Sequence, residues 1–234
     1  MNIADKVKMD FENAINTAIK DWERDAHEPA GLFSRNRKLD KVTMIKAICL
    51  MGGNSLRKEL YDYPSLKVSA SSFSERRAAI NSELLYYVLR RFSDTDNGND
   101  AFLCKGRKLI AIDGVNFNTA LNGYNQYKAT VMLDLLSHQT VDMVLHPISK
   151  QNEHADAAFM VAWNDFPPCI FVCDRLYSSY PLIADFQQKG LDFVIRTKQN
   201  NGALKLIQAL QMKDLDEDIE FVLTDSQSLE SKKK

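Results

Sequence analysis

Residues 169–197, CIFVCDRLYSSYPLIADFQQKGLDFVIRT, decide the fold class of this chain. The first five residues form a continuous apolar run, which predicts a buried strand ending at Asp174. Residues 181–189 predict a short helix that begins with proline and is closed by Gly190, and residues 191–197 predict another strand. An apolar strand, a helix and a second apolar strand in succession indicate a parallel β-α-β unit.

The segments before this unit predict three more strands and one more helix. Residues 109–112 are a compact apolar run that ends at Asp113. Residues 126–136 and 140–148 are β-rich and separated by Ser-His-Gln, so they predict an antiparallel hairpin. Residues 153–163 have helical spacing. The resulting order, β-β-β-α-β-α-β, is that of a ribonuclease H-like fold, an α/β class with a mixed sheet and flanking helices.

The N-terminal third of the chain predicts helices only. Apolar residues recur at helical spacing over residues 4–24, 40–50, 56–61 and 72–92. Asp40 is placed to cap the second helix, which stops at Gly52-Gly53. Ser72-Phe73-Ser74-Glu75 has the form of a capping box at the start of the fourth helix. This arrangement fits a helical DNA-binding region, and it fits a plain helical bundle equally well.

A polar segment separates the two patterns. Residues 93–100, SDTDNGND, contain no large apolar residue and predict a flexible linker. The predicted domains are a helical region over 1–92, a linker over 93–108, an incomplete ribonuclease H-like core over 109–199, and a remainder over 200–234. The remainder is either the start of an inserted region or a disordered tail.

Charge is distributed unevenly along the chain, although the net charge is only −1. Residues 31–92 contain twelve Lys or Arg against five Asp or Glu, a surplus of seven positive charges. A basic helical segment attached to a neutral or acidic remainder indicates contact with a polyanion such as DNA. The alternative is that these charges lie on solvated helix faces.

Composition excludes several classes of protein. No apolar run is long enough to cross a membrane, and the N-terminus lacks the features of a signal peptide, so a cytoplasmic protein is expected. The four cysteines form no CxxC pair, which argues against a zinc site or a disulfide framework. His138, His146 and His154 have no partner identifiable in the sequence for a histidine-based nuclease site, so they are expected to be solvent-exposed.

Two carboxylates are candidates for chemistry, because Asp113 and Asp174 each follow a short apolar strand. In the predicted sheet these two strands are adjacent and parallel, so both carboxylates emerge at the same edge. Carboxylate oxygens suit Mg²⁺, with Mn²⁺ as a substitute, and such ions can promote phosphodiester displacement. The alternative is that each Asp is a turn or helix-capping residue.

Four segments of the chain carry a family resemblance: SSFSERRAAI (71–80), AIDG (111–114), KQNEHADAAF (150–159) and the block FVCDRLYSSYPLIADFQQKGLDFVIRTKQN (171–200). They resemble the insertion-sequence DDE transposases of family four, over the span from about residue 30 to residue 200. The resemblance implies a transposase that binds the terminal repeats of its element and target DNA, works as a homodimer in the synaptic complex, and associates with the nucleoid.

The resemblance also implies roles for individual residues. Asp113 is the first catalytic acid and Asp174 the second, and both are Mg²⁺ ligands. The residues implied to contact DNA are Arg76, Arg77, Arg175, Tyr177, Arg196 and Lys198. For Arg175 and Tyr177 the alternative is packing at the strand end, and for Arg196 and Lys198 it is an exposed charge without a special role.

The chain departs from the family pattern in three places. Leu176 stands where the family usually has glycine, and Val115 where Ser or Thr is frequent. The family's third acid, a glutamate in a Tyr-Arg-Glu-Lys signature, has no counterpart in these 234 residues. The expectation is therefore a C-terminally truncated or decayed copy, or the first part of a longer protein, with poor phosphoryl-transfer activity.

Two other readings remain open at this point. In the first, the chain is a non-catalytic DNA-binding remnant that competes with an intact enzyme for the element's ends. In the second, it is a small ribonuclease H-like nuclease whose third acid comes from the tail, for example Asp214 or Glu217.

Overall fold

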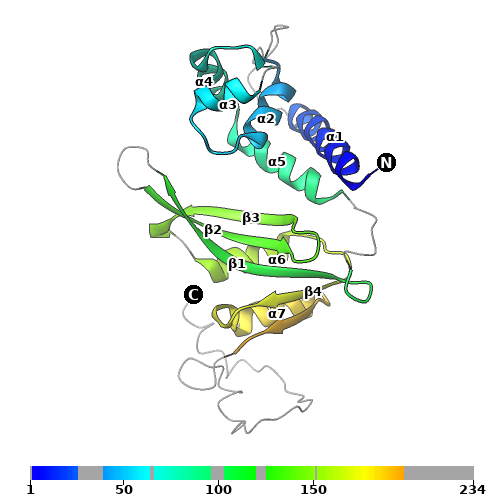
Figure 1. Ribbon diagram of the computed structural model, residues 1–234. Helices are drawn as coiled ribbons and strands as arrows, with labels where there is room; N and C mark the ends of the chain where they lie inside the picture. Colours follow the sequence, from blue (N-terminus) through cyan, green and yellow to red (C-terminus); the bar gives the residue numbers. More distant parts are fainter. Residues whose placement is uncertain are drawn as a thin grey trace, which may run out of the picture. The chain divides into compact units, whose positions relative to one another are not determined.

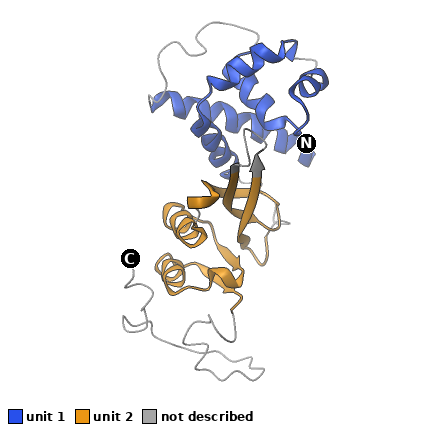
Figure 2. Cartoon of the chain, turned by 90° about the vertical axis from the view of Figure 1, so that its left-hand side faces the viewer, with its two compact units in different colours: residues 1–98 blue, residues 99–234 orange. Residues whose placement is uncertain are grey.

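The computed structural model describes residues 2–25, 39–63, 66–95, 103–119, 125–150 and 152–197. The chain forms two compact units, residues 1–98 and residues 99–234, shown in two colours in Figure 2. The division falls inside the segment that the sequence predicts to be a linker. The remainder predicted over residues 200–234 lies outside the described residues, as does everything beyond residue 197.

The secondary structure in the described part of unit 1 is helical, and its α-helices are labelled in Figure 1. They are α1 (Ile3–Arg24), α2 (Lys41–Leu50), α3 (Leu56–Asp62), α4 (Ala70–Ala78) and α5 (Ser82–Ser93). The apolar face of α1 packs against α2 and α5 around the buried side chains of Ile15, Trp22 and Ile45. Asp40 caps α2, because its carboxylate accepts a hydrogen bond from the Thr43 backbone N–H at 2.7 Å.

The helix predicted over residues 72–92 is wrong in one respect, because the structure divides it into α4 and α5. The capping residue of α4 is Ser69, whose hydroxyl accepts from the Ser72 N–H at 3.2 Å. The capping residue of α5 is Asn81, whose side chain accepts from the Glu83 N–H at 3.0 Å. The Asn81 side chain accepts a hydrogen bond from a backbone N–H that has no partner inside the helix, and so allows α5 to begin there. The spacing of apolar residues does not predict this break.

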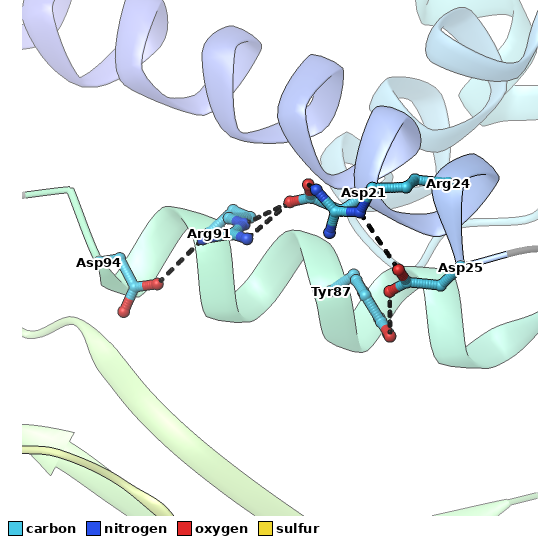
Figure 3. A network of polar contacts seen from close by, with 6 residues as sticks. All are labelled: Asp21, Arg24, Asp25, Tyr87, Arg91 and Asp94. Atoms are coloured by element: carbon cyan, nitrogen blue, oxygen red, sulfur yellow. Dashed lines mark hydrogen bonds and ion pairs between the residues drawn. The ribbon is translucent and has the colours of Figure 1, made fainter.

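A polar network joins the end of α1 to α5 (Figure 3). Asp21 is buried, and its carboxylate accepts from the Arg91 guanidinium at 2.7 Å and pairs with Arg24 at 3.1 Å. The Tyr87 hydroxyl donates to Asp25 at 3.3 Å, which ties the same two helices together one turn further on. Arg91 of α5 therefore forms an ion pair within unit 1 and stabilises the contact between α1 and α5.

A prediction concerns Glu59, which organises the turn between α2 and α3. Its carboxylate accepts from the backbone N–H groups of Asn54 and Gly52 at 2.7 and 3.1 Å, and these bonds lower the pKa of Glu59. A lowered pKa in the folded state stabilises the fold above the ordinary glutamate value of about 4.3. That contribution is lost as the pH falls through the lowered value.

We therefore expect the unfolding free energy of the wild type to fall on acidification from pH 5 to pH 3 more steeply than that of Glu59→Gln. Urea unfolding followed by circular dichroism at several pH values measures both slopes. Glu75→Gln, at an exposed position of α4, is the control and should follow the wild type. Equal slopes for the wild type and Glu59→Gln would contradict this role for Glu59.

The described residues of unit 2 form a five-stranded mixed sheet with two α-helices and two short 3₁₀ helices; Figure 1 shows how they are arranged. Its strands are β1 (Lys108–Thr119), β2 (Asn125–Asp134), β3 (Thr140–Pro147), β4 (Cys169–Cys173) and β5 (Asp192–Ile195). Its helices are η3 (Ile148–Lys150), α6 (Glu153–Trp163), η4 (Arg175–Tyr177) and α7 (Tyr180–Gln188). The strand order is β3-β2-β1-β4-β5. The predicted hairpin and the predicted parallel pairing of the first and fourth strands are both confirmed.

Helices α6 and α7 cover the same face of the sheet (Figure 2). Alternate residues of β4 point into the core on this face, where Phe171 packs against Phe186 of α7 with ring centroids 4.9 Å apart. Ile110 and Ile112 of β1 and Met160 of α6 complete the centre of the same core. The architecture is that of a ribonuclease H-like fold, as the sequence predicts.

Strand β1 is longer than predicted. The sequence places its end at residue 112, whereas the structure continues it to Thr119. The parallel partner β4 does stop opposite Ile112, but β1 goes on pairing with β2 up to Thr119↔Asn125. The apolar run ends at Ile112, where β1 loses its second neighbouring strand, β4. The hydropathy pattern therefore marks the end of the part of β1 that is paired on both sides, and not the end of the strand.

Candidate active site

The sheet brings Asp113 and Asp174 together. The last paired residues of the parallel strands β1 and β4 are Ile112 and Cys173. Asp113 and Asp174 each follow directly, so they occupy neighbouring positions on adjacent strands, whose backbones are about 4.8 Å apart in a regular sheet. The two acids are 61 positions apart in the sequence, and the hairpin, α6 and the strand β4 lie between them.

Both carboxylates lie on the same side of the sheet edge. Ile112 and Cys173 are buried beneath α6 and α7, and successive side chains of extended backbone point to opposite faces. Asp174 has extended backbone, with φ −71° and ψ 167°. Asp113 and Asp174 therefore project away from the helices, and both are exposed. Two anionic side chains are thus held next to each other and open to solvent.

The hydrogen bonds of Asp113 and Asp174 argue against the alternative that these acids act only as turn or capping residues. One Asp113 carboxylate oxygen accepts from the Gly114 N–H at 2.8 Å, which leaves the other oxygen directed elsewhere. Asp174 precedes η4, yet within the described residues its side chain makes no capping hydrogen bond. The Asp174 backbone carbonyl instead accepts from the Tyr177 N–H at 3.0 Å. The Asp174 carboxylate is not needed to form the turn.

The donor set fits a hard divalent cation. Two carboxylates at neighbouring strand positions supply the oxygen ligands that Mg²⁺ and Mn²⁺ prefer, with water or phosphate oxygens completing the coordination. Among the residues that the structure describes, no group of three or more His, Cys, Asp or Glu side chains gathers in a metal-binding arrangement. In the described part of the chain, the candidate site therefore consists of the two carboxylates.

The neighbouring thiols do not contribute to this chemistry. Burial raises the pKa of Cys173 to about 12 and that of Cys169 to about 11. Both thiols therefore stay protonated at neutral pH, and a protonated thiol is neither a good nucleophile nor a metal ligand. Their side chains belong to the core beneath α6 and α7.

A second polar group lies behind the two acids, on the helix-covered face. Glu153, the first residue of α6, forms an ion pair with Lys128 of β2 and accepts a hydrogen bond from the Tyr177 hydroxyl at 3.2 Å. Tyr177 is fully buried, and burial and then the nearby charges of Glu153 and Asp113 raise its pKa, so the hydroxyl stays protonated. The sequence predicts neither Lys128 nor Glu153 as part of the site.

The residues predicted to contact DNA fall into different environments. Arg175 and Arg196 are exposed at the carboxyl ends of neighbouring strands, close in the chain to Asp174 and β5 respectively. The Arg196 N–H donates to the Cys173 carbonyl at 3.1 Å, which holds Arg196 beside the second acid. The buried position of Tyr177 gives it a packing role in place of a surface contact. Lys198 lies outside the described residues.

In unit 1 the two predicted arginines also differ. The Arg76 guanidinium donates to the Leu39 carbonyl at 2.8 Å, so it helps to join the start of α2 to α4. Arg77 is exposed at the end of α4. Of the pair, Arg77 is the side chain that a ligand can reach.

Comparison with known proteins adds two findings. The model of the family described as "Transposase DDE domain" matches residues 105–233, which is more than half of the chain. No curated protein matches the chain. In addition, none of the helices in the described ranges is long and apolar enough to cross a membrane.

Proposed function

The chain belongs to the transposase DDE domain family, and on that premise we propose that it acts on transposon DNA through a divalent-metal site formed by Asp113 and Asp174. The observation that carries the proposal is the register of β1 and β4, which places these two acids side by side and exposed. Within the family we assign it to the insertion-sequence transposases of family four, with Mg²⁺ as the metal and Mn²⁺ as a substitute.

The residues of the site have separate tasks in this proposal. Asp113 and Asp174 would hold the metal, which, when bound, activates the attacking oxygen and stabilises the leaving oxygen of the phosphodiester. Arg175 and Arg196 are exposed beside the acids and would contact the phosphates on either side of the scissile bond. Positioning and electrostatic stabilisation of this kind make up most of the catalysis of phosphoryl transfer.

We propose that residues 1–234 alone bind DNA but cut it poorly. Two carboxylates are gathered in the described part of the chain, and the Tyr-Arg-Glu-Lys signature that carries the family's third acid does not occur in these residues. The proposal is tested by a nicking assay on DNA carrying candidate element ends, with and without Mg²⁺ or Mn²⁺. Robust metal-dependent nicking that Asp174→Asn abolishes would show that residues 1–234 contain a sufficient set of ligands, and would contradict the low activity proposed here.

The second candidate function is a non-catalytic competitor for the element's ends, and the charges of unit 1 bear on it. The positive surplus of residues 31–92 is partly neutralised inside unit 1, because Lys41 pairs with Glu23 and Arg91 with Asp21. The cations that are exposed on and beside α3 and α4 include Arg57, Lys67 and Arg77. DNA binding would therefore depend on this region more than on the charge of the whole unit.

A prediction follows for Arg77. We expect Arg77→Ala to weaken DNA binding about equally for specific and unrelated sequences, because a phosphate contact carries no sequence information. The slope of log K against log salt should fall by about 0.9 for one lost phosphate contact. Fluorescence anisotropy at several salt concentrations measures both effects.

Lys20→Ala provides the matched control, since Lys20 is an exposed cation of α1 in the same unit. It should leave both the affinity and the salt slope close to those of the wild type. Equal losses for the two variants would indicate a diffuse charge effect and would contradict a contact at Arg77.

A further inference from the structure

Glu153 lies where four elements of unit 2 meet. It begins α6, and its carboxylate pairs with Lys128 of β2 and accepts from Tyr177 at the end of η4. The fourth element is β1: a side chain at Gly114 would place its Cβ 2.9 Å from the Glu153 Cδ atom and 2.8 Å from the Lys128 Cε atom. The side chains of Lys128 and Glu153 thus lie close to the backbone of β1 at Gly114, the residue after Asp113.

Tyr177 connects the same group to the second acid. Residues 174–177 form one tight turn, in which the Tyr177 N–H donates to the Asp174 carbonyl at 3.0 Å. The Tyr177 ring is buried in the core of unit 2, and its hydroxyl reaches Glu153 at 3.2 Å. The position of the Asp174 backbone is therefore linked, through one side chain, to the same carboxylate that abuts Gly114.

The partial burial of the Lys128–Glu153 ion pair makes it a weak source of net stability. The side chains of Lys128 and Glu153 are only 19% and 10% exposed, and removing an ion pair from water costs free energy that the attraction between the charges only partly offsets. Apolar side chains could fill the same space. From this position the pair contacts both acid-bearing segments, β1 at Gly114 and the turn at Tyr177.

We propose that Glu153 is a positioning residue for the metal site, which holds β1 at Gly114 and the turn at Tyr177 so that Asp113 and Asp174 keep their mutual spacing. This inference rests on the proposed function. Glu153 acts from behind the two acids, on the helix-covered face, and does not touch the metal. Gly114 is needed for the same arrangement, because a side chain at this position would displace Lys128 and Glu153 from β1.

Mn²⁺ titration of the full chain, read by electron paramagnetic resonance, tests this role without requiring activity. Partners outside the first coordination sphere change metal affinity by about 10–100-fold when they are removed. We expect Glu153→Gln to weaken Mn²⁺ binding within this range, because the neutral amide can still accept from Tyr177 but no longer pairs with Lys128. Tyr177→Phe should weaken it less, and Lys128→Arg, which keeps the charge, should stay near the wild type.

Thr130→Val is the matched control, because the Thr130 hydroxyl of β2 donates at 2.9 Å to Asp156, one turn further along α6. It removes a buried polar link between the same two elements at the residue that pairs with Gly114, but it leaves the contacts of Glu153 intact. We expect it to lower the unfolding free energy in urea by an amount similar to that of Tyr177→Phe, because each variant removes one buried hydrogen bond. The Mn²⁺ affinity should stay within about twofold of the wild type, because a lost hydrogen bond of this kind changes stability and not the metal site.

The outcomes separate the inference from the proposed function. If the wild type and Asp113→Asn bind Mn²⁺ equally, the metal site itself is wrong. If Asp113→Asn abolishes binding but Glu153→Gln and Tyr177→Phe change only stability, as Thr130→Val does, Glu153 has no positioning role. Should Glu153→Gln fail to fold, Tyr177→Phe, which removes a single hydroxyl, decides the question by the same criterion.

Discussion

Asp174→Asn and Asp113→Asn are each expected to weaken Mn²⁺ binding by more than about a hundredfold, the upper range for residues that only support metal ligands. Each variant replaces one of two carboxylates with a neutral amide and so removes half of the negative charge at the site. Because both acids are exposed and outside the core, the unfolding free energy should change little. Isothermal titration with Mn²⁺, together with urea unfolding, measures the two quantities on the same samples.

Asp165→Asn is a suitable control for this prediction, since Asp165 is an exposed acid of the same unit between α6 and β4. It makes the same chemical change and should bind Mn²⁺ as the wild type does. If all three variants lost affinity to a similar, small degree, the metal would be responding to general negative charge and not to the pair of strand-end acids.

Phe171→Ala is expected to lower the unfolding free energy of unit 2 by about 3–5 kcal/mol, the range for truncating a fully buried phenylalanine. Phe171 has no exposed surface and contacts the rings of Phe166 and Phe186, with centroids 5.0 and 4.9 Å away. It lies on β4, the strand that carries Asp174 at its end. A loss of this size is a large part of the stability of a typical domain, so Mn²⁺ binding should be lost together with the fold.

Phe159→Ala removes the same atoms from a side chain that is 54% exposed on α6. It should cost less than about 1 kcal/mol, because little apolar surface is returned to water. Urea unfolding followed by circular dichroism compares the two variants. Similar costs for both would contradict the core that the structure places between the sheet and its helices.

The sequence predicts the parts of the fold that depend on local patterns. Strand β4 and helix α6 begin and end where apolar spacing, Asp174 and the prolines after α6 place them. The neighbouring positions of Asp113 and Asp174 are also predictable, because the predicted strand order makes the first and fourth strands parallel neighbours. These features depend on residue type and spacing over short segments, and on general rules of connection.

Features that depend on contacts between distant residues could not be predicted in the same way. The continuation of β1 beyond Asp113 comes from its pairing with β2, and the division between α4 and α5 comes from the cap at Asn81. The link from Glu153 to Lys128 and Tyr177 joins residues 25 and 24 positions apart. A sequence signal for Glu153 did exist, because it lies within residues 150–159, which resemble the family, but its partners become visible only in the folded unit.

The most direct test of the central claim is the location of a bound metal. Crystals of the chain soaked in Mn²⁺ and measured at the manganese absorption edge should show an anomalous peak between the carboxylates of Asp113 and Asp174, with an oxygen of each about 2.1 Å away, close to the metal–oxygen distance of octahedral Mg²⁺. A peak at other side chains, with these two carboxylates left without metal, would contradict the assignment of the two strand-end acids as the metal site.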